Sequence, residues 1–116
     1  MSRYTCLGKI ESVKFGNNMG YQDSMFGIEF CLSFVNGHVN TGDKFCTFAP
    51  SKWQWTAQSN WSPLDRDNKI VDIIHFIDRL LSDAKVGQVS DLKGIPVEIT
   101  LVDKTFESFR ILTEVL

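Results

Sequence analysis

The chain has 116 residues, of which 43% are hydrophobic and 22% are charged. A chain of this size buries enough apolar surface to fold without disulfides or metal, and its composition is far from that of disordered proteins. Twelve Lys and Arg against fourteen Asp and Glu give a formal charge of −2, which argues against a duplex-DNA-binding protein. The sequence therefore predicts one globular domain over residues 1–116.

Neither an export signal nor a membrane segment is visible in the sequence. No run approaches the stretch of about 20 apolar residues that spans a bilayer. The residues from Met1 to Cys6 lack the apolar core of a secretory signal. We therefore expect no membrane partner and a cytoplasmic location.

The cysteines Cys6, Cys31 and Cys46 are scattered through apolar or β-branched surroundings. An odd number of dispersed cysteines without a Cys-x-x-Cys pair favours reduced thiols that fill the core. A zinc site would require these cysteines to meet His38 or His75, and no spacing indicates such a meeting. We expect no metal and no cofactor.

The first predicted strand covers residues 9–15, where polar and apolar residues alternate as far as Ser12. It ends at residues 16–18, Gly-Asn-Asn, which favour a turn. Ile10, Val13 and Phe15 cannot all lie on one face of a regular strand. The conflict requires either a β-bulge or burial on both faces, and the sequence does not choose between them.

Two further strands are predicted in the N-terminal half. Residues 27–35 are rich in aromatic and β-branched residues and end at Asn36-Gly37, a dipeptide typical of tight hairpins. Residues 44–48 follow a second turn and are closed by Pro50. These segments indicate an antiparallel meander.

A long amphipathic helix follows from residue 62 onward. Ser62-Pro63-Leu64-Asp65 supplies an N-cap serine, a proline at the first helical position and a carboxylate in the first turn. The helix is expected to end near Lys85-Val86-Gly87, with the glycine in the left-handed conformation. The apolar stripe that we expect to face the sheet consists of Ile70, Ile73, Ile74, Ile77, Leu80, Leu81 and Ala84.

The C-terminal part is predicted as a β-hairpin. Residues 95–102 alternate apolar and polar, Asp103-Lys104 forms the turn, and residues 106–116 return as the last strand. The fold class is therefore α+β, an antiparallel sheet with one long amphipathic helix and a C-terminal β-hairpin. The sequence leaves open whether the sheet curls into a small OB-like barrel or stays open.

Candidate catalytic residues are few. His75 lies on the polar helix face near Asp72 and Arg79, a pattern more typical of a solvated surface than of a base with its carboxylate. His38 lies in a hairpin turn, and Cys31 has no neighbouring base in the sequence. Nucleophile-elbow, phosphate-loop and metalloprotease patterns are absent, so we do not expect an enzyme.

The strongest candidate for a partner-binding site is the polar stretch that holds all three tryptophans, which we expect to be an ordered loop. Lys52, Trp53, Trp55 and Trp61 lie in it among Ser, Gln, Thr and Asn. Tryptophans in such a loop either pack beneath it or contact a partner, and both alternatives remain open at this level. Residues 17–23, with Tyr21 and Asp23, form a second candidate contact loop.

Three segments carry a resemblance to a known group of proteins. These are residues 9–16 (Lys-Ile-x-Ser-Val-x-Phe-Gly), 20–23 (Gly-Tyr-Gln-Asp) and 109–116 (Phe-Arg-Ile-Leu-Thr-Glu-Val-Leu). In these motifs the chain resembles small accessory proteins of tailed bacteriophages and prophages. The resemblance implies a compact phage product, made in the bacterial cytoplasm, that binds a host protein, a defence component or its signalling nucleotide.

The leading hypothesis is a non-enzymatic binding protein that blocks or sequesters a host factor through the tryptophan loop. The alternative is a single-stranded nucleic-acid-binding module that stacks bases on Trp53, Trp55 and Trp61, with Lys52 and Arg3 near the phosphates. The net charge of −2 weighs against this alternative. An enzyme centred on His75, His38 or Cys31 is the third and weakest hypothesis.

The first prediction concerns stability without metal or disulfide. Thermal unfolding in EDTA, and separately in a thiol reductant, should give the melting temperature of the untreated protein, because neither a metal nor a disulfide is expected. Unfolding in EDTA would contradict the interpretation of the three cysteines.

Overall fold

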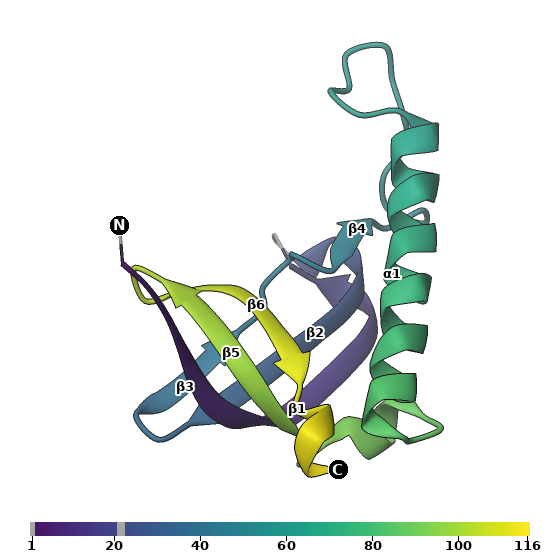
Figure 1. The fold of residues 1–116 in the computed structure, drawn as a ribbon. Coiled ribbons are helices and arrows are strands. Elements are labelled where there is room, and N and C mark those ends of the chain that lie inside the picture. The colour runs from purple at the N-terminus through teal and green to yellow at the C-terminus, as the bar shows by residue number, and fades with distance from the viewer. Residues whose placement is uncertain (1, 21–22) are drawn as a thin grey trace.

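The computed structural model describes residues 2–20 and 23–116, and within them it has one antiparallel sheet and one long helix (Figure 1). This arrangement confirms the predicted α+β class with its C-terminal hairpin. The strands are β1 (Arg3–Met19), β2 (Met25–Phe34), β3 (Gly37–Asn40), β4 (Cys46–Phe48), β5 (Pro96–Val102) and β6 (Thr105–Ile111). The helices are α1 (Pro63–Ala84) and the short 3₁₀ helices η2 (Val89–Leu92) and η3 (Thr113–Val115).

The long strand β1 belongs to both halves of the sheet. Its residues 3–9 pair with β5 and its residues 8–19 pair with β2, so the strand order is β3-β2-β1-β5-β6, with β4 added to β2. The sheet curls strongly, and β3 and β6, which end this order, lie near each other (Figure 1). They form no ladder within the described residues, so the curled sheet stays open.

A β-bulge in β1 resolves the conflict in its sequence pattern. The pairing with β2 shifts register between Ile10 and Ser12, which lets Ile10 be fully buried while Val13 still packs against the core. The turn predicted at residues 16–18 is wrong, because β1 continues to Met19. A second register shift and the positive φ of Asn18, 65°, absorb the irregular sequence there.

Other element ends also differ from the sequence pattern. The hairpin between β2 and β3 is confirmed, but its two turn residues are Val35 and Asn36, and Gly37 already pairs with Phe34. The left-handed residue that ends α1 is Lys85, not Gly87, and its N–H donates to carbonyls of the last helical turn. The final strand stops at Ile111, after which Thr113–Val115 turns as η3.

Aromatic rings fix α1 against the sheet. Phe76 of α1 stacks on Phe45 at 4.2 Å and meets Phe30 of β2 and Phe109 of β6 edge-on at 6.3 Å each. Phe30 is fully buried beneath them. The residues of α1 that are themselves buried are Ile73, Ile77, Leu80 and Ala84.

The predicted burial of Ile74 is wrong, since 52% of its surface is exposed. Ile74 lies at the edge of the apolar stripe, on the side away from Leu80, and the body of the protein covers the side that carries Leu80 and Ala84. Ile70 and Leu81 are half-buried. The helix thus buries fewer residues of its apolar stripe than the sequence predicts.

The difference between two isoleucines of α1 gives a matched test. Ile77→Ala should lower the free energy of unfolding by about 2 to 5 kcal/mol, because it removes a buried side chain from the helix–sheet contact. Ile74→Ala, three residues away, should change it by less than about 0.5 kcal/mol. Urea denaturation of both variants measures this, and an Ile77→Ala protein as stable as wild type would contradict the packing of α1.

Candidate partner-binding site

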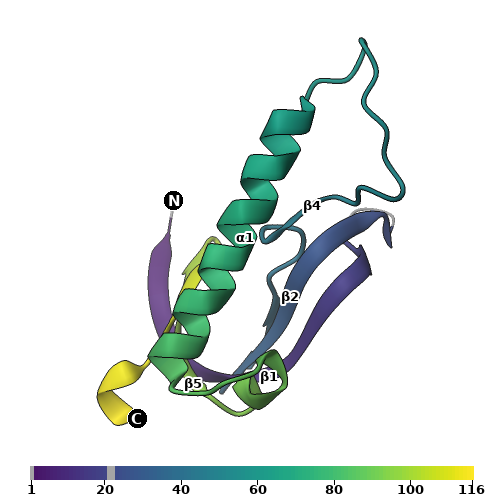
Figure 2. The ribbon, with the colours of Figure 1, turned by 90° about the vertical axis from the view of Figure 1, so that its right-hand side faces the viewer.

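The segment between β4 and the middle of α1 projects from the body of the protein (Figures 1 and 2). It consists of the loop 50–62 and the first ten residues of α1, 63–72, and we call it the tryptophan arm. No residue of α1 before Ile73 is buried. The arm therefore owes little of its order to the hydrophobic core.

The predicted N-cap serine is confirmed, and it forms a capping box that starts the helical part of the arm. The Ser62 hydroxyl accepts a hydrogen bond from the backbone N–H of Asp65 at 3.1 Å, and the Asp65 carboxylate accepts one from the N–H of Ser62 at 3.0 Å. Two N–H groups without intrahelical partners are satisfied in this way. The loop consequently enters α1 in a fixed direction.

Two of the three tryptophans of the arm pack on the ring of Phe48 at the end of β4. Trp61 is stacked on Phe48 at 4.9 Å, and Trp53 lies against the same ring at 5.1 Å. The guanidinium of Arg66 lies 5.3 Å from the centre of the Trp61 ring and donates a hydrogen bond to the Trp53 carbonyl at 3.1 Å. We call this group of Trp53, Phe48, Trp61 and Arg66 the aromatic stack.

The arm is also tied to the segment between β1 and β2. The Lys52 ammonium donates to Asn18 Oδ1 and, at 3.1 Å, to the carbonyl of Asp23. The indole N–H of Trp53 donates to the Ser24 carbonyl at 3.1 Å. The tryptophan loop thus contacts Asn18 and Asp23 of the second candidate segment, 17–23, whose Tyr21 lies outside the described residues.

Trp55 differs from the other tryptophans. Half of its surface, 51%, is exposed, and it has no ring contact or hydrogen bond with any described residue. Trp53 and Trp61 are half-buried in the aromatic stack. Trp53 and Trp61 therefore pack against other side chains, which is one of the two alternatives expected from the sequence. Trp55 instead leaves its aromatic ring available to a partner.

Exposed apolar side chains continue from the loop along α1. Leu64, Val71 and Ile74 are 67%, 51% and 52% exposed. Their spacings of seven and three residues place them on one side of the helix. Together with Trp55 they leave apolar side chains exposed along the arm and the turn of α1 that follows it.

The structure brings together Cys31 and His38, two residues considered for catalysis. His38 Nε2 lies 2.6 Å from Glu11 Oε2, and Cys31 Sγ lies 4.0 Å from the same oxygen. Burial and then the charge of Glu11 raise the pKa of the Cys31 thiol. Because the carboxylate opposes the thiolate, the arrangement does not activate Cys31 as a nucleophile.

The remaining candidates form no site in the part of the chain that is described. His75 is exposed on α1. Within residues 2–20 and 23–116, no three or more His, Cys, Asp and Glu side chains are grouped so that they could hold a metal ion. No helix in the same residues combines the length and apolar character needed to cross a bilayer. The three cysteines are free thiols, with Cys46 buried and Cys6 and Cys31 half-buried.

Comparison with known proteins gives no relative: no family model, no curated protein and no solved structure matches this chain.

The sequence did not single out Phe48 and Arg66 as parts of the site. Phe48 ends a predicted strand, and Arg66 lies one turn after the N-cap. At neither position does the residue type by itself indicate a role in binding. An aromatic residue immediately before a tryptophan-rich loop was the available signal, because such rings need a surface to pack on.

Substitutions of Trp61 and Trp55 should have different effects on the free energy of unfolding. Trp61→Ala should lower the free energy of unfolding by about 1 to 3 kcal/mol, because the stacking of Trp61 on Phe48 and Arg66 is lost. Loss of a fully buried ring would cost more, about 3 to 5 kcal/mol. Trp55→Ala should stay within about 0.5 kcal/mol of wild type. Thermal or urea unfolding checks both values, and a strongly destabilised Trp55→Ala variant would show that Trp55 packs in the fold.

Proposed function

We propose that this protein is a non-enzymatic binding protein that engages a protein partner through the tryptophan arm. The observation that carries this proposal is Trp55, a half-exposed tryptophan in a projecting loop whose other two tryptophans are fixed by stacking. Tryptophan is strongly enriched among the residues that dominate binding energy at protein interfaces. A side chain presented on an already ordered loop also loses little conformational entropy on binding.

The surface around Trp55 favours a protein over a nucleic acid. The nearby cations are engaged internally: Lys52 bonds Asn18 and Asp23, Arg66 lies on Trp61, and Lys69 donates to the Lys44 carbonyl at 3.0 Å. Exposed carboxylates lie on the same part of α1, at Asp65, Asp67 and Asp72. Nucleic-acid binding requires available cations along the phosphate path.

Exposed apolar side chains also lie on the part of α1 that follows the loop. Leu64, Val71 and Ile74 supply aliphatic groups that suit a hydrophobic patch on a protein and offer little to a phosphate backbone. An interface centred on Trp55 and rimmed by the aspartates and Ser or Gln side chains of the arm has the usual apolar centre and polar rim. We therefore place single-stranded nucleic acid second.

The identity of the partner as a host factor rests on the resemblance to phage accessory proteins. On that basis the protein acts in the bacterial cytoplasm and blocks or sequesters a host protein, such as a defence component. The environment of Cys31 and His38 adds nothing in favour of an enzyme, since Glu11 opposes the thiolate.

The experiment introduces a photo-crosslinking amino acid at position 55 of the full chain in bacterial cells. Position 115 is the matched control, because Val115 is also an exposed apolar residue and lies at the C-terminal end. A host protein cross-linked from position 55 and not from 115 is then purified, and its affinity is measured by calorimetry. Trp55→Ala should weaken that affinity at least about 30-fold, equivalent to about 2 kcal/mol, and Val115→Ala should leave it unchanged.

Three results would contradict the proposal. They are equal cross-linking from both positions, cross-links only between copies of this chain, and an affinity that Trp55→Ala leaves unchanged. Binding of single-stranded oligonucleotides that falls steeply with salt and depends on Trp55 would favour the alternative instead.

A further inference from the structure

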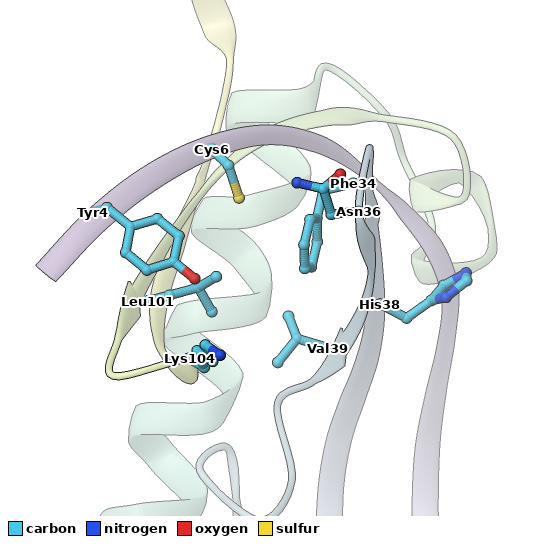
Figure 3. A pocket seen from close by; sticks show the side chains of 8 residues that line it. All are labelled: Tyr4, Cys6, Phe34, Asn36, His38, Val39, Leu101 and Lys104. Carbon is cyan, nitrogen blue, oxygen red and sulfur yellow. The ribbon is translucent and has the colours of Figure 1, made fainter. Parts of the chain in front are cut away.

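A second candidate site lies at the end of the curled sheet away from the tryptophan arm (Figure 3). There β1 has left β2 and pairs with β5, so the two hairpins at the ends of β2 and β5 surround a space that the sheet does not fill. This space is a pocket of about 440 Å³, and we call it the end pocket. Its volume is within the range of small-molecule sites, about 300 to 1,000 Å³.

The floor of the end pocket is apolar. Cys6, Phe34, Val39 and Leu101 line it, and each comes from a different strand or strand end. In Figure 3 the Phe34 ring and the Cys6 sulfur extend into the space, with the Tyr4 ring on the opposite side. Two aromatic rings that flank an apolar space suit a planar ring placed between them.

Polar groups without partners lie around this floor. The Tyr4 hydroxyl, the Asn36 amide and the Lys104 ammonium line the pocket, and none bonds to any described residue. In Figure 3 the Tyr4 hydroxyl is directed toward Lys104, whereas the His38 ring, which contacts Glu11, is turned away from the pocket. Tyr4 and Lys104 can therefore each donate a hydrogen bond to a ligand, and the Asn36 amide can both donate and accept one.

The pocket has a net positive lining. None of its eight lining residues is acidic. The neighbouring carboxylates are already engaged, since Glu107 pairs with Arg3 at 2.6 Å and Asp103 accepts from the Ser2 N–H at 2.8 Å. Lys104 is thus a cation whose charge no described carboxylate neutralises by contact.

The turn that carries Lys104 is held in place. Asp103 and Lys104 both have positive φ, 51° and 69°, as in the tightest hairpin turns. The Asp103 N–H donates to the Ser2 carbonyl at 2.8 Å, and Asp103 Oδ1 accepts from the Ser2 N–H. These bonds hold the backbone of the turn against the start of β1 before any ligand binds.

We propose that the end pocket binds a small planar heteroaromatic anion of the nucleoside monophosphate class. The base lies between Tyr4 and Phe34, the Asn36 amide bonds its polar edge, and the phosphate meets the Lys104 ammonium and the Tyr4 hydroxyl. The terminal 5′-phosphate nucleotide of a single strand has the same chemistry. The apolar floor and the limited volume favour the free nucleotide.

Calorimetric titration of the full chain with AMP, GMP, CMP and UMP tests this proposal. At least one mononucleotide should bind saturably, and tighter than adenosine or inorganic phosphate, because ring and anion are recognised together. Lys104→Gln should weaken that binding at least about tenfold, the usual effect of losing a charge-assisted hydrogen bond. Lys93→Gln, at an exposed lysine beyond the opposite end of β5, is the matched control and should leave the affinity unchanged.

Alkylation of the cysteines provides a readout that does not depend on a variant folding. Cys6 lines the pocket, whereas Cys31 contacts Glu11 on another face. Burial raises the pKa of the Cys6 thiol, so iodoacetamide labelling is done near pH 9. The bound mononucleotide should slow labelling of Cys6 and leave that of Cys31 unchanged, as measured by peptide mass spectrometry.

The proposal is overturned if no mononucleotide binds saturably, or if Lys104→Gln and Lys93→Gln have equal effects. Equal protection of both cysteines also overturns it. Binding of a 5′-phosphorylated oligodeoxynucleotide in the absence of mononucleotide binding would assign the pocket to strand ends instead. The end pocket and the tryptophan arm share no residue, so failure at either one leaves the other proposal intact.

Discussion

Gly8 of β1, where the strand changes its neighbour, is the constraint on which both ends of the molecule depend. Gly8 pairs with Phe34 on one side and with Val97 on the other. A Cβ at this position would lie 2.1 Å from the Ser33 carbonyl oxygen and 2.9 Å from the Ile99 side chain, so the three strands approach closely only around a glycine. Before Gly8 the strand follows β5 and opens the end pocket. After it the strand follows β2 toward the segment that anchors Lys52 and Trp53.

The helix and the arm are stabilised by different kinds of contact. The second half of α1 is held by the rings of Phe30, Phe45, Phe76 and Phe109, which are core contacts. The first ten residues, 63–72, include no buried residue and depend on the capping box, the aromatic stack and the Lys52 hydrogen bonds. An exposed side chain can therefore be carried on an ordered segment without contributing to the core. This separation makes binding and stability independently measurable at Trp55.

The two candidate sites differ in the chemistry that they offer. On the tryptophan arm, Lys52, Arg66 and Lys69 already donate to protein oxygens, which leaves apolar surface as the main attraction. At the end pocket Lys104 has no such acceptor, and a concave apolar floor lies beside it. A flat apolar surface suits a macromolecule, and a concave site with one available cation suits a small anion.

Local sequence determined the elements whose signals are contained within a few residues. The Ser62 to Asp65 cap, the repeat of isoleucines and leucines in α1, and the Asp103-Lys104 turn were all predicted because neighbouring residues decide them. Tertiary structure alone decided that Ile77 is buried and Ile74 exposed, and that Trp53 and Trp61 stack on Phe48 while Trp55 does not. It also placed Glu11 between Cys31 and His38, and Tyr4 across from Phe34 and Lys104. These contacts join residues far apart in the chain, and their geometry follows from the curl and register of the sheet, which a local pattern does not encode.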